Sequence, residues 1–187
     1  MVGVSYTEPR HIDYRKLTTG LDYYENLGYH YMEVPWAVSH ESLAVTLPVG
    51  AIGTSVQYGE LVGSGEQSFI ELMRRGAIIA KACCITPCFR IEKSYDRLHH
   101  PYFMKLELIN TDATQENLKE MIRDAREFLK KFIVTEVEET GPNTYDIVDR
   151  YRRIELGSYG FRAYGNTTFI YGTGIALPRL DTVMQHQ

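Results

Sequence analysis

The chain has 187 residues, of which 44% are hydrophobic and 24% charged, a composition typical of one soluble globular domain with a full core. No apolar run approaches the roughly 20 residues of a membrane-spanning helix, and the first residues lack the apolar stretch of a signal peptide, so we expect a cytoplasmic protein. A net charge of −4 excludes a global positive field that would gather nucleic acid.

The first part of the chain alternates helical and extended patterns. The spacing predicts a helix over about 14–27 that ends at Gly28, followed by a strand that ends at Pro35. Residues 39–60 are rich in Gly, Ser and Thr, which indicates loops and small strands. The stretch 68–82, SFIELMRRGAIIAKA, has helical spacing again.

The middle of the chain predicts a pair of strands and one amphipathic helix. Residues 83–92 and 102–110 are predicted strands joined by the charged loop KSYDRLHHP. Asp112 or Thr114 can cap the helix that follows. Its apolar residues recur at three- and four-residue steps: Leu118, Met121, Ile122, Ala125, Leu129 and Phe132.

The last part of the chain predicts strands separated by polar turns. The segments 145–149, 153–159 and 166–174 are extended in pattern, and a helix opened by glycine is predicted over 174–185. Long strands in hairpin order with helices between them indicate an α+β fold, in which helices flank an antiparallel β-sheet.

Cysteines and local basic clusters give weaker signals. Cys83, Cys84 and Cys88 lie in one apolar stretch, which favours buried reduced thiols over disulfides or a zinc site. Two basic clusters are candidates for RNA contacts, although a solvated charged face explains each equally well. They are Arg123, Arg126, Lys130 and Lys131, and then Arg150, Arg152 and Arg153.

The stretch 89–107, FRIEKSYDRLHHPYFMKLE, has the residue types of a nucleotide site. An arginine fork such as that of Arg90 binds phosphate through paired charge-assisted hydrogen bonds, and the ring of Phe103 can stack on a purine. A carboxylate such as Glu107 can bind a magnesium ion that bridges phosphates. The alternative is an ordinary exposed ion pair between neighbouring strands.

The order of these residues resembles the second signature motif of the class II aminoacyl-tRNA synthetases. That motif has an aromatic residue, Arg, any residue and Glu, then a loop, and then His or Arg before a Phe and an acidic residue. FRIE matches its first part. His99, Phe103 and Glu107, with three residues between each and the next, match the second.

This resemblance implies a role for each matching residue. Arg90 would hold the α-phosphate of ATP together with the substrate carboxylate, and Arg97 or His99 would reach the outer phosphates. Phe103 would stack on adenine. Two carboxylates would bind the adenine edge or carry Mg²⁺, with Glu107 as the metal candidate and Glu92 as the other member of the pair.

Two further segments resemble the other motifs of the class. FIYGTGIALPRL resembles the third motif, with Gly172, Gly174 and Arg179 matching and Pro178 in place of the usual Glu. By the resemblance Arg179 joins Arg90 and Glu92 as a catalytic residue. The alternative is that the glycines only form an ordinary turn between a strand and a helix. ENLGYHYMEVPW resembles the first motif, with Gly28 and Pro35 matching, and implies a homodimer.

The resemblance is nearest to the subclass of phenylalanyl, pyrrolysyl and phosphoseryl enzymes. It makes residues 1–187 a single catalytic domain without an anticodon-binding domain. By position, the substrate pocket would be lined from the strand floor and the segment before the second motif. Its candidates are Ser64, Glu66, Gln67, Glu155, Gly157, Ser158 and Gly160, of which the small residues would leave room for a side chain.

The implied function is ATP-dependent activation of an amino acid or related carboxylic acid as an acyl-adenylate. The cofactors would be ATP and Mg²⁺, and the acyl acceptor a tRNA acceptor end or another molecule. This chemistry requires positioning and charge neutralisation rather than a protein nucleophile. The rival is a non-catalytic paralogue that acts as a binding or regulatory module, because a fold does not guarantee an activity.

Overall fold

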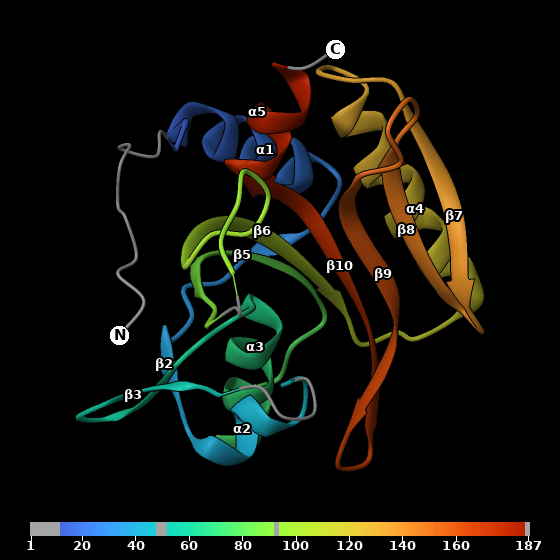
Figure 1. Ribbon diagram of the computed structural model, residues 1–187. Helices are drawn as coiled ribbons and strands as arrows, with labels where there is room; N and C mark the ends of the chain where they lie inside the picture. The colour runs from blue at the N-terminus through green and yellow to red at the C-terminus, as the bar shows by residue number, and fades with distance from the viewer. Residues whose placement is uncertain (1–11, 48–51, 92–93, 186–187) are drawn as a thin grey trace.

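The computed structural model describes residues 12–47, 52–91 and 94–185, which form a seven-stranded sheet, a three-stranded sheet and five helices (Figure 1). The large sheet has the order β1-β5-β6-β10-β9-β8-β7, and only the β1–β5 pair is parallel. Its strands are β1 His30–Tyr31, β5 Lys81–Phe89, β6 Tyr102–Asn110, β7 Thr135–Gly141, β8 Thr144–Asp149, β9 Glu155–Tyr164 and β10 Thr167–Leu177. The α+β fold with an antiparallel sheet is confirmed.

Helices cover the two faces of this sheet unequally. They are α1 Tyr14–Asn26, α2 His40–Ala44, α3 Gly65–Arg74, α4 Gln115–Leu129 and α5 Arg179–Met184. The long helices α1 and α4 pack on one face, where Tyr24, Phe128 and Leu106 belong to one core cluster. Helix α3 packs on the opposite face, where Phe69 contributes to a second cluster. Part of that second face is left without a helix (Figure 1).

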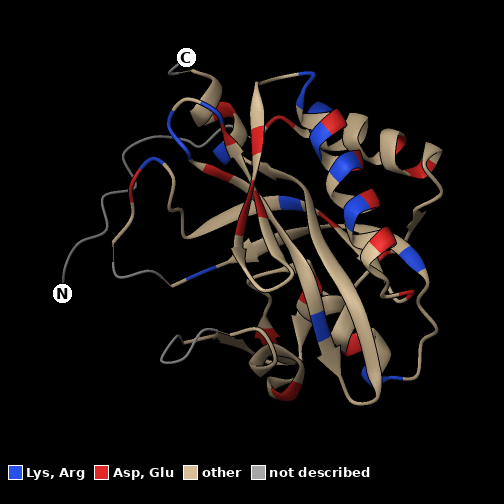
Figure 2. Cartoon of the chain, turned by 90° about the vertical axis from the view of Figure 1, so that its right-hand side faces the viewer, with Lys and Arg blue, Asp and Glu red and all other residues tan. Residues whose placement is uncertain are grey.

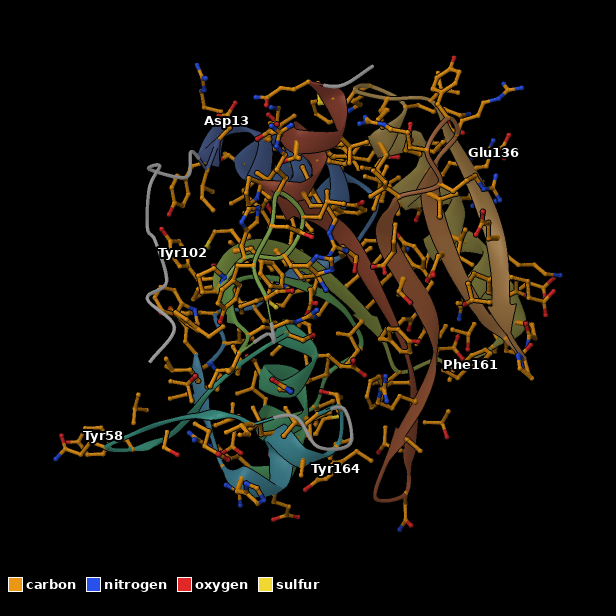
Figure 3. All side chains as sticks on the ribbon, in the orientation of Figure 1. Asp13, Tyr58, Tyr102, Glu136, Phe161 and Tyr164 are labelled. Carbon is orange, nitrogen blue, oxygen red and sulfur yellow. The ribbon has the colours of Figure 1, made fainter. Side chains whose placement is uncertain are left out.

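A smaller sheet lies beside α2 and α3. It has the order β2-β4-β3, with β2 Ala37–Val38, β3 Thr54–Val56 and β4 Gly59–Leu61. Tyr58 stands at the outer end of the β3–β4 hairpin, 85% exposed (Figure 3). No helix in the described ranges has the length and apolar character needed to cross a membrane.

The predicted helix after the strand pair is confirmed as α4. The hydroxyl of Thr114 accepts a hydrogen bond from the backbone N–H of Asn117 at 3.2 Å, so Thr114 rather than Asp112 is the N-cap. The apolar stripe of the helix is buried against the sheet. Burial of Cys83, Cys84 and Cys88 as free thiols is confirmed too.

Two predicted helices have other boundaries. The helix predicted over 68–82 is α3, which begins at Gly65 and ends at Arg74, because Gly76 takes a left-handed conformation with φ +84° and β5 starts soon afterwards. The helix predicted from Gly174 begins only at Arg179, because β10 continues to Leu177 and pairs with β6.

Two strands also differ from the prediction. The strand expected up to Pro35 is only the pair His30–Tyr31 in β1. The strand β7 was not expected from its pattern, because its residues TEVEETG are mostly polar and the strand forms the outer edge of the sheet.

Candidate active site

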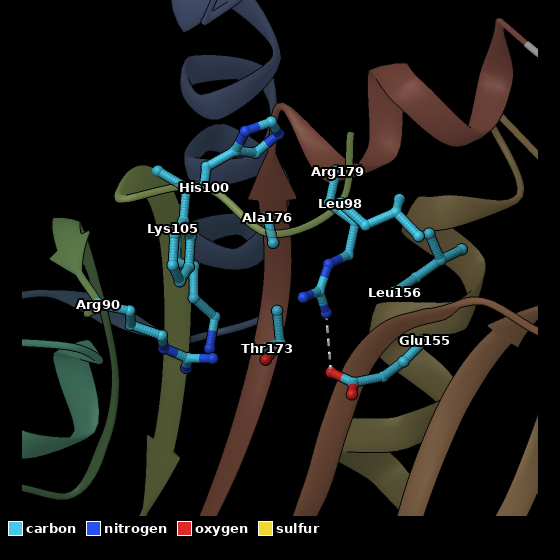
Figure 4. A pocket seen from close by; sticks show the side chains of 10 residues that line it. Arg90, Leu98, His100, Lys105, Glu155, Leu156, Thr173, Ala176 and Arg179 are labelled. Carbon is cyan, nitrogen blue, oxygen red and sulfur yellow. Dashed lines mark hydrogen bonds and ion pairs between the residues drawn. The ribbon is translucent and has the colours of Figure 1, made fainter. Parts of the chain in front are cut away.

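The sheet face left open beside α3 carries a pocket. Strand alternation turns Phe103, Lys105 and Glu107 of β6 to this face, while Leu106 and Leu108 turn to α1 and α4. The pocket encloses about 410 Å³ of empty space that is partly open to solvent. Its lining comes from β6, β9, β10, α5 and the loop before β6 (Figure 4): Arg90, Leu98, His100, Phe103, Lys105, Glu155, Leu156, Thr173, Ala176 and Arg179.

Arg90 follows β5 directly and lies at one side of the pocket. Its Nε donates a hydrogen bond to the carbonyl of Gly63 at 3.1 Å. Its guanidinium carbon lies 5.0 Å from the centre of the Phe103 ring, a cation–π contact. The structure therefore brings Arg90 and Phe103 together across the β5–β6 hairpin, with the ring half-buried in the pocket lining.

Arg179 reaches the same pocket from the first turn of α5. Its Nη1 lies 3.3 Å from Oε1 of Glu155 on β9, the interaction drawn as a dashed line in Figure 4. Proline is accommodated at a helix start, so Pro178 does not turn the arginine away. Residues from three distant segments thus meet here, as the second and third motifs implied.

The charged side chains of the pocket lining are mostly cationic. Arg90, Lys105 and Arg179 carry positive charge against the single carboxylate of Glu155, and Lys105 also pairs with Glu107 outside the lining. Charge-assisted hydrogen bonds from such groups are the means by which proteins hold phosphate and carboxylate oxygens. The arrangement can neutralise several of the negative charges of a nucleoside triphosphate.

His100 is a pocket residue that sequence reasoning missed in favour of its neighbour. The carboxylate of Asp96 accepts hydrogen bonds from the backbone N–H of Leu98 at 2.7 Å and of His99 at 2.8 Å, and this turn directs His99 outward. The His99 ring pairs with Asp96 and is 51% exposed. His100 is 9% exposed, and neither ring nitrogen has a hydrogen-bond partner among the described residues.

The other predicted nucleotide contacts of this loop receive no support. Arg97 is exposed and does not line the pocket. Glu92 lies outside the described residues. The motif resemblance selects His99, but the loop conformation places His100 in the pocket lining. A motif register counts residues and cannot show the Asx turn that decides which of two adjacent histidines faces inward.

Glu107 is engaged in a structural network and is not a free metal ligand. It is 3% exposed, and each of its carboxylate oxygens lies 2.9 Å from the Ser64 hydroxyl. The backbone N–H of Glu66 donates to Oε2 at 2.6 Å, and Lys105 pairs with Oε1. Glu107 therefore anchors the N-terminus of α3, where a negative charge is favourable. Gly65 lets the carboxylate of Glu107 approach the helix closely, because a Cβ at this position would lie 2.8 Å from Oε2.

The residues that fit a magnesium ion are correspondingly few. Among the described residues no group of three His, Cys, Asp or Glu side chains is placed to hold a metal. Mg²⁺ in nucleotide sites needs only one or two carboxylates, with phosphates and water completing its shell. Glu155 is the carboxylate of the pocket and its side chain is 48% exposed, so it fits this requirement better than Glu107 does.

Glu66 forms a buried ion pair beside this network. Its carboxylate pairs with Nε of Arg162 on β9. Burial raises the pKa of Glu66 to about 7, an effect that outweighs the opposing charge of Arg162. Gln67, by contrast, bonds the backbone N–H of Gly63 at 2.8 Å and the carbonyl of Leu43 at 3.2 Å, so it holds the chain together instead of facing a substrate.

Tyrosine side chains fill the space next to the glycines that were expected to make room for a substrate. A Cβ at Gly160 would lie 2.9 Å from the Tyr171 hydroxyl, and one at Gly157 would lie 2.7 Å from the Tyr159 hydroxyl. The expectation that these positions leave space for a substrate side chain is wrong. Ser158 between them remains half-buried on the open face.

The glycines of the third-motif segment serve helix packing. A Cβ at Gly172 would meet the sulfur of Met121 in α4 at 2.6 Å. One at Gly174 would meet Tyr24 of α1 at 2.8 Å. Both glycines therefore face the helices, and they allow α1 and α4 to approach β10 closely.

The two basic clusters do not adjoin the pocket. Arg150, Arg152 and Arg153 pair with acidic residues at the β7–β8 end of the sheet: Glu136, Glu138 and Asp149. The other cluster lies on α4 and just after it, where basic and acidic residues alternate (Figure 2). Helix α4 covers the face of the sheet opposite to the pocket, so this second cluster is not placed to guide RNA into it. Arg152 of the first cluster donates to the carbonyl of Val183 in α5, the helix that carries Arg179.

Comparison with known proteins identifies the fold. No protein-family model matches the sequence, and no curated protein matches it. The structure is similar to a pyrrolysyl-tRNA synthetase of Desulfitobacterium hafniense, with a TM-score of 0.71 and 14% identity over 95% of this chain and 70% of that one. It is also similar to a cytoplasmic serine-tRNA ligase of Naegleria fowleri in complex with AMP, with a TM-score of 0.66 and 15% identity over 90% of this chain and 52% of that one.

Both similar structures contain class II synthetase catalytic domains, so this chain has a class II aminoacyl-tRNA synthetase-like core. The resemblance drawn from the sequence is confirmed at the level of the fold. The chain spans only about half of the serine-tRNA ligase chain.

Proposed function

We propose that this protein activates an amino acid or a related carboxylic acid with ATP, forming an acyl-adenylate. The observation that carries the proposal is the convergence of Arg90, Phe103 and Arg179 on one cationic pocket. These residues come from the β5–β6 hairpin and from the distant helix α5, and they are among those that the motif resemblance selects. A synthetase-like fold alone would not support an activity.

The pocket supplies what the reaction needs. A carboxylate oxygen attacks the α-phosphorus of ATP, a new P–O bond forms, and the bond to the leaving pyrophosphate breaks with its electron pair. Arg90 can hold both negatively charged reactants in line, and Arg179 with Lys105 offsets the charge of the phosphates. Phe103 provides a stacking surface for the base once the Arg90 guanidinium moves to phosphate.

Magnesium would assist in the usual way for phosphoryl chemistry. Mg²⁺ would supply positive charge that neutralises the developing charge of the phosphates. Glu155 is the side chain that would hold it here, and its partner Arg179 would then be released to the nucleotide. We propose further that the protein acts in the cytoplasm as a homodimer and passes the acyl group to a tRNA acceptor end or another acceptor.

One observation favours the rival, a non-catalytic binding module. Two arginines of the pocket already have partners within the chain: Arg90 lies over the Phe103 ring, and Arg179 pairs with Glu155. A module of this kind could keep the pocket as a structural feature. Both contacts involve partly exposed side chains, however, and such pairs contribute little stability, so phosphate can displace them.

ATP binding separates the two. Titration calorimetry of the purified protein with ATP and Mg²⁺ should show binding that Arg90→Ala weakens by roughly 10- to 100-fold, the loss expected for a charge-assisted phosphate contact. The matched control is Arg123→Ala, an exposed arginine on α4 behind the sheet, which should bind ATP as the parent does. Absence of ATP binding by the folded parent protein would favour the rival.

A further inference from the structure

Five polar side chains line the open sheet face next to the pocket. They come from α3, β8, β9 and β10, and are called here the polar wall: Glu66, Asp146, Ser158, Arg162 and Tyr171. None belongs to the pocket lining described above, but they adjoin it: the lining residue Lys105 pairs with the buried Glu107, which is bonded to the backbone of Glu66, and Tyr171 lies two residues before the lining residue Thr173 on β10. An acid held by Arg90 at the α-phosphate would direct its side chain to this wall.

The wall is one connected set of interactions. Ser158 stands opposite Asp146 in the β8–β9 register, and Tyr171 of β10 stands opposite Gly160, two residues further along β9. The guanidinium carbon of Arg162 lies 4.9 Å from the centre of the Tyr171 ring. Arg162 pairs in turn with Glu66, whose backbone N–H is bonded to Glu107.

The wall offers no apolar surface to a substrate. The face of Tyr171 is covered by Arg162, and the space above Gly160 is taken by the Tyr171 hydroxyl. The neighbouring apolar residues Ile109 of β6 and Phe169 of β10 are 1% and 0% exposed and belong to the core under α3. The surface next to the pocket is thus polar, and Gly160 leaves no recess in it.

We infer that the acid activated by this protein has a short, uncharged side chain that forms hydrogen bonds, a hydroxyl or a carboxamide. This substrate class rests on the proposed function, because it assumes that Arg90 holds the acid. Asp146 and Glu66 offer acceptors, whereas Arg162 and the Tyr171 hydroxyl offer donors. A side chain that both donates and accepts matches this mixture. Glu66 and Arg162 compensate each other's charge, and the remaining carboxylate, that of Asp146, disfavours an acidic side chain.

The physical basis is the cost of leaving polar groups unpaired. A bulky apolar side chain would remove water from the Glu66–Arg162 pair and from Ser158 without replacing any hydrogen bond. Sites built to hydrogen-bond a substrate group reject the analogue without it by roughly 10⁴- to 10⁵-fold. Because Ser158, Asp146 and Arg162 are only half-buried here, we expect a smaller preference of at least about 100-fold.

Pairs of amino acids with matched shapes test this directly. Binding of threonine and valine, asparagine and leucine, and serine and alanine would be measured by calorimetry on the full chain with a non-hydrolysable ATP analogue. In at least one pair the polar member should bind about 100-fold more tightly. Equal or tighter binding of the apolar member in every pair, or no binding of all six at millimolar concentration, would overturn the assignment.

A conservative variant tests the wall itself. Tyr171→Phe removes one hydroxyl and should reduce the preference for the polar member of the pair by roughly 10-fold, the value of one hydrogen bond. Tyr58→Phe makes the same change on the 85% exposed hairpin and should leave the preference unchanged. An unaltered preference in Tyr171→Phe would remove this tyrosine from the assigned contacts and contradict the wall as the selecting surface.

Pyrophosphate exchange with the same six acids separates this assignment from the proposed function. Exchange with valine, leucine or alanine in place of their polar partners would uphold acid activation and overturn the substrate class. Selective binding of a polar acid without any exchange would uphold the polar wall as a binding site and contradict acid activation.

Discussion

His100 is buried at the pocket without a hydrogen-bond partner among the described residues, a costly state for an imidazole unless a ligand completes it. We predict that His100→Leu raises the free energy of unfolding of the nucleotide-free protein by about 1 kcal/mol, because an unpaired polar group is removed. The same variant should weaken ATP binding about 10-fold. Denaturant unfolding and calorimetry measure the two effects.

The neighbouring histidine is the matched control. His99→Leu alters an exposed ring paired with Asp96 and should leave ATP affinity within about twofold of the parent. If His99→Leu weakened ATP binding and His100→Leu did not, the motif register would be the correct guide to this loop and the structural placement would be contradicted.

Glu66 gives the site a pH-dependent stability. Its pKa is about 7 in the folded protein against 4.5 as the ordinary value, so between these pH values the folded state binds more protons than the unfolded state. The free energy of unfolding should therefore fall as pH rises from about 4.5 to about 7, by up to roughly 3 kcal/mol. Glu66→Gln should abolish this fall, measured as the difference between the urea unfolding curves of variant and parent.

Glu139→Gln on β7 provides the comparison for that titration, since Glu139 is exposed. Its pH profile should follow that of the parent. A Glu66→Gln profile with the parent's slope across this pH window would show that Glu66 is ionised in the folded protein throughout.

Residue-level prediction from the sequence succeeded where chemistry and motif order agree. Arg90, Phe103 and Arg179 could be selected because their types suit phosphate and base, and the structure brings them together. Glu107 could not be judged in this way, because its partner Ser64 lies 43 residues away in the chain. Only the packing of α3 against β6 reveals that its carboxylate is already occupied.

At the scale of elements, the contact of α1 with β10 depends on a missing side chain. A Cβ at Gly174 would lie 2.5 Å from Cδ2 of Leu106 and 2.8 Å from the ring of Tyr24. We predict that Gly174→Ala lowers the free energy of unfolding by about 1–3 kcal/mol, the usual cost of overpacking. Urea unfolding measures the change.

Gly141→Ala is the control for this substitution, because the nearest atoms to its Cβ are 3.9 Å away. It should change stability by less than about 0.5 kcal/mol. If Gly174→Ala folded with unchanged stability but lost ATP binding, the glycine would serve the nucleotide rather than the helix.

Elements were predictable where one physical signal dominates. The stripe of α4 and the cap at Thr114 are local, and both are confirmed. The end of α3 was missed although Gly76 marks it locally, and the length of β10 was missed because it depends on long-range pairing. Strand β10 continues past Gly174 since Ala176 and Leu177 pair with Lys105 and Met104 of β6.

At the scale of the whole molecule, we expect a homodimer formed through α1 and β1. Exposed apolar side chains gather in this part of the chain: Tyr14, Leu27, Tyr31 and Trp36. Sedimentation velocity of the parent protein at micromolar concentration should show a dimer. Trp36→Arg replaces a 55% exposed indole by a charged side chain and should give a monomer. Ile78→Arg, at a residue 96% exposed beyond α3, should remain dimeric. A monomeric parent protein would contradict this expectation.

The central claim is that the cationic pocket joins ATP to a carboxylic acid, and exchange of labelled pyrophosphate into ATP tests it most directly. The twenty standard amino acids would be assayed with the parent protein, Arg90→Ala and Arg123→Ala. We predict exchange with at least one acid, lost in Arg90→Ala and retained in Arg123→Ala. Exchange with none of the acids, by a folded protein that also fails to bind ATP, would contradict the account.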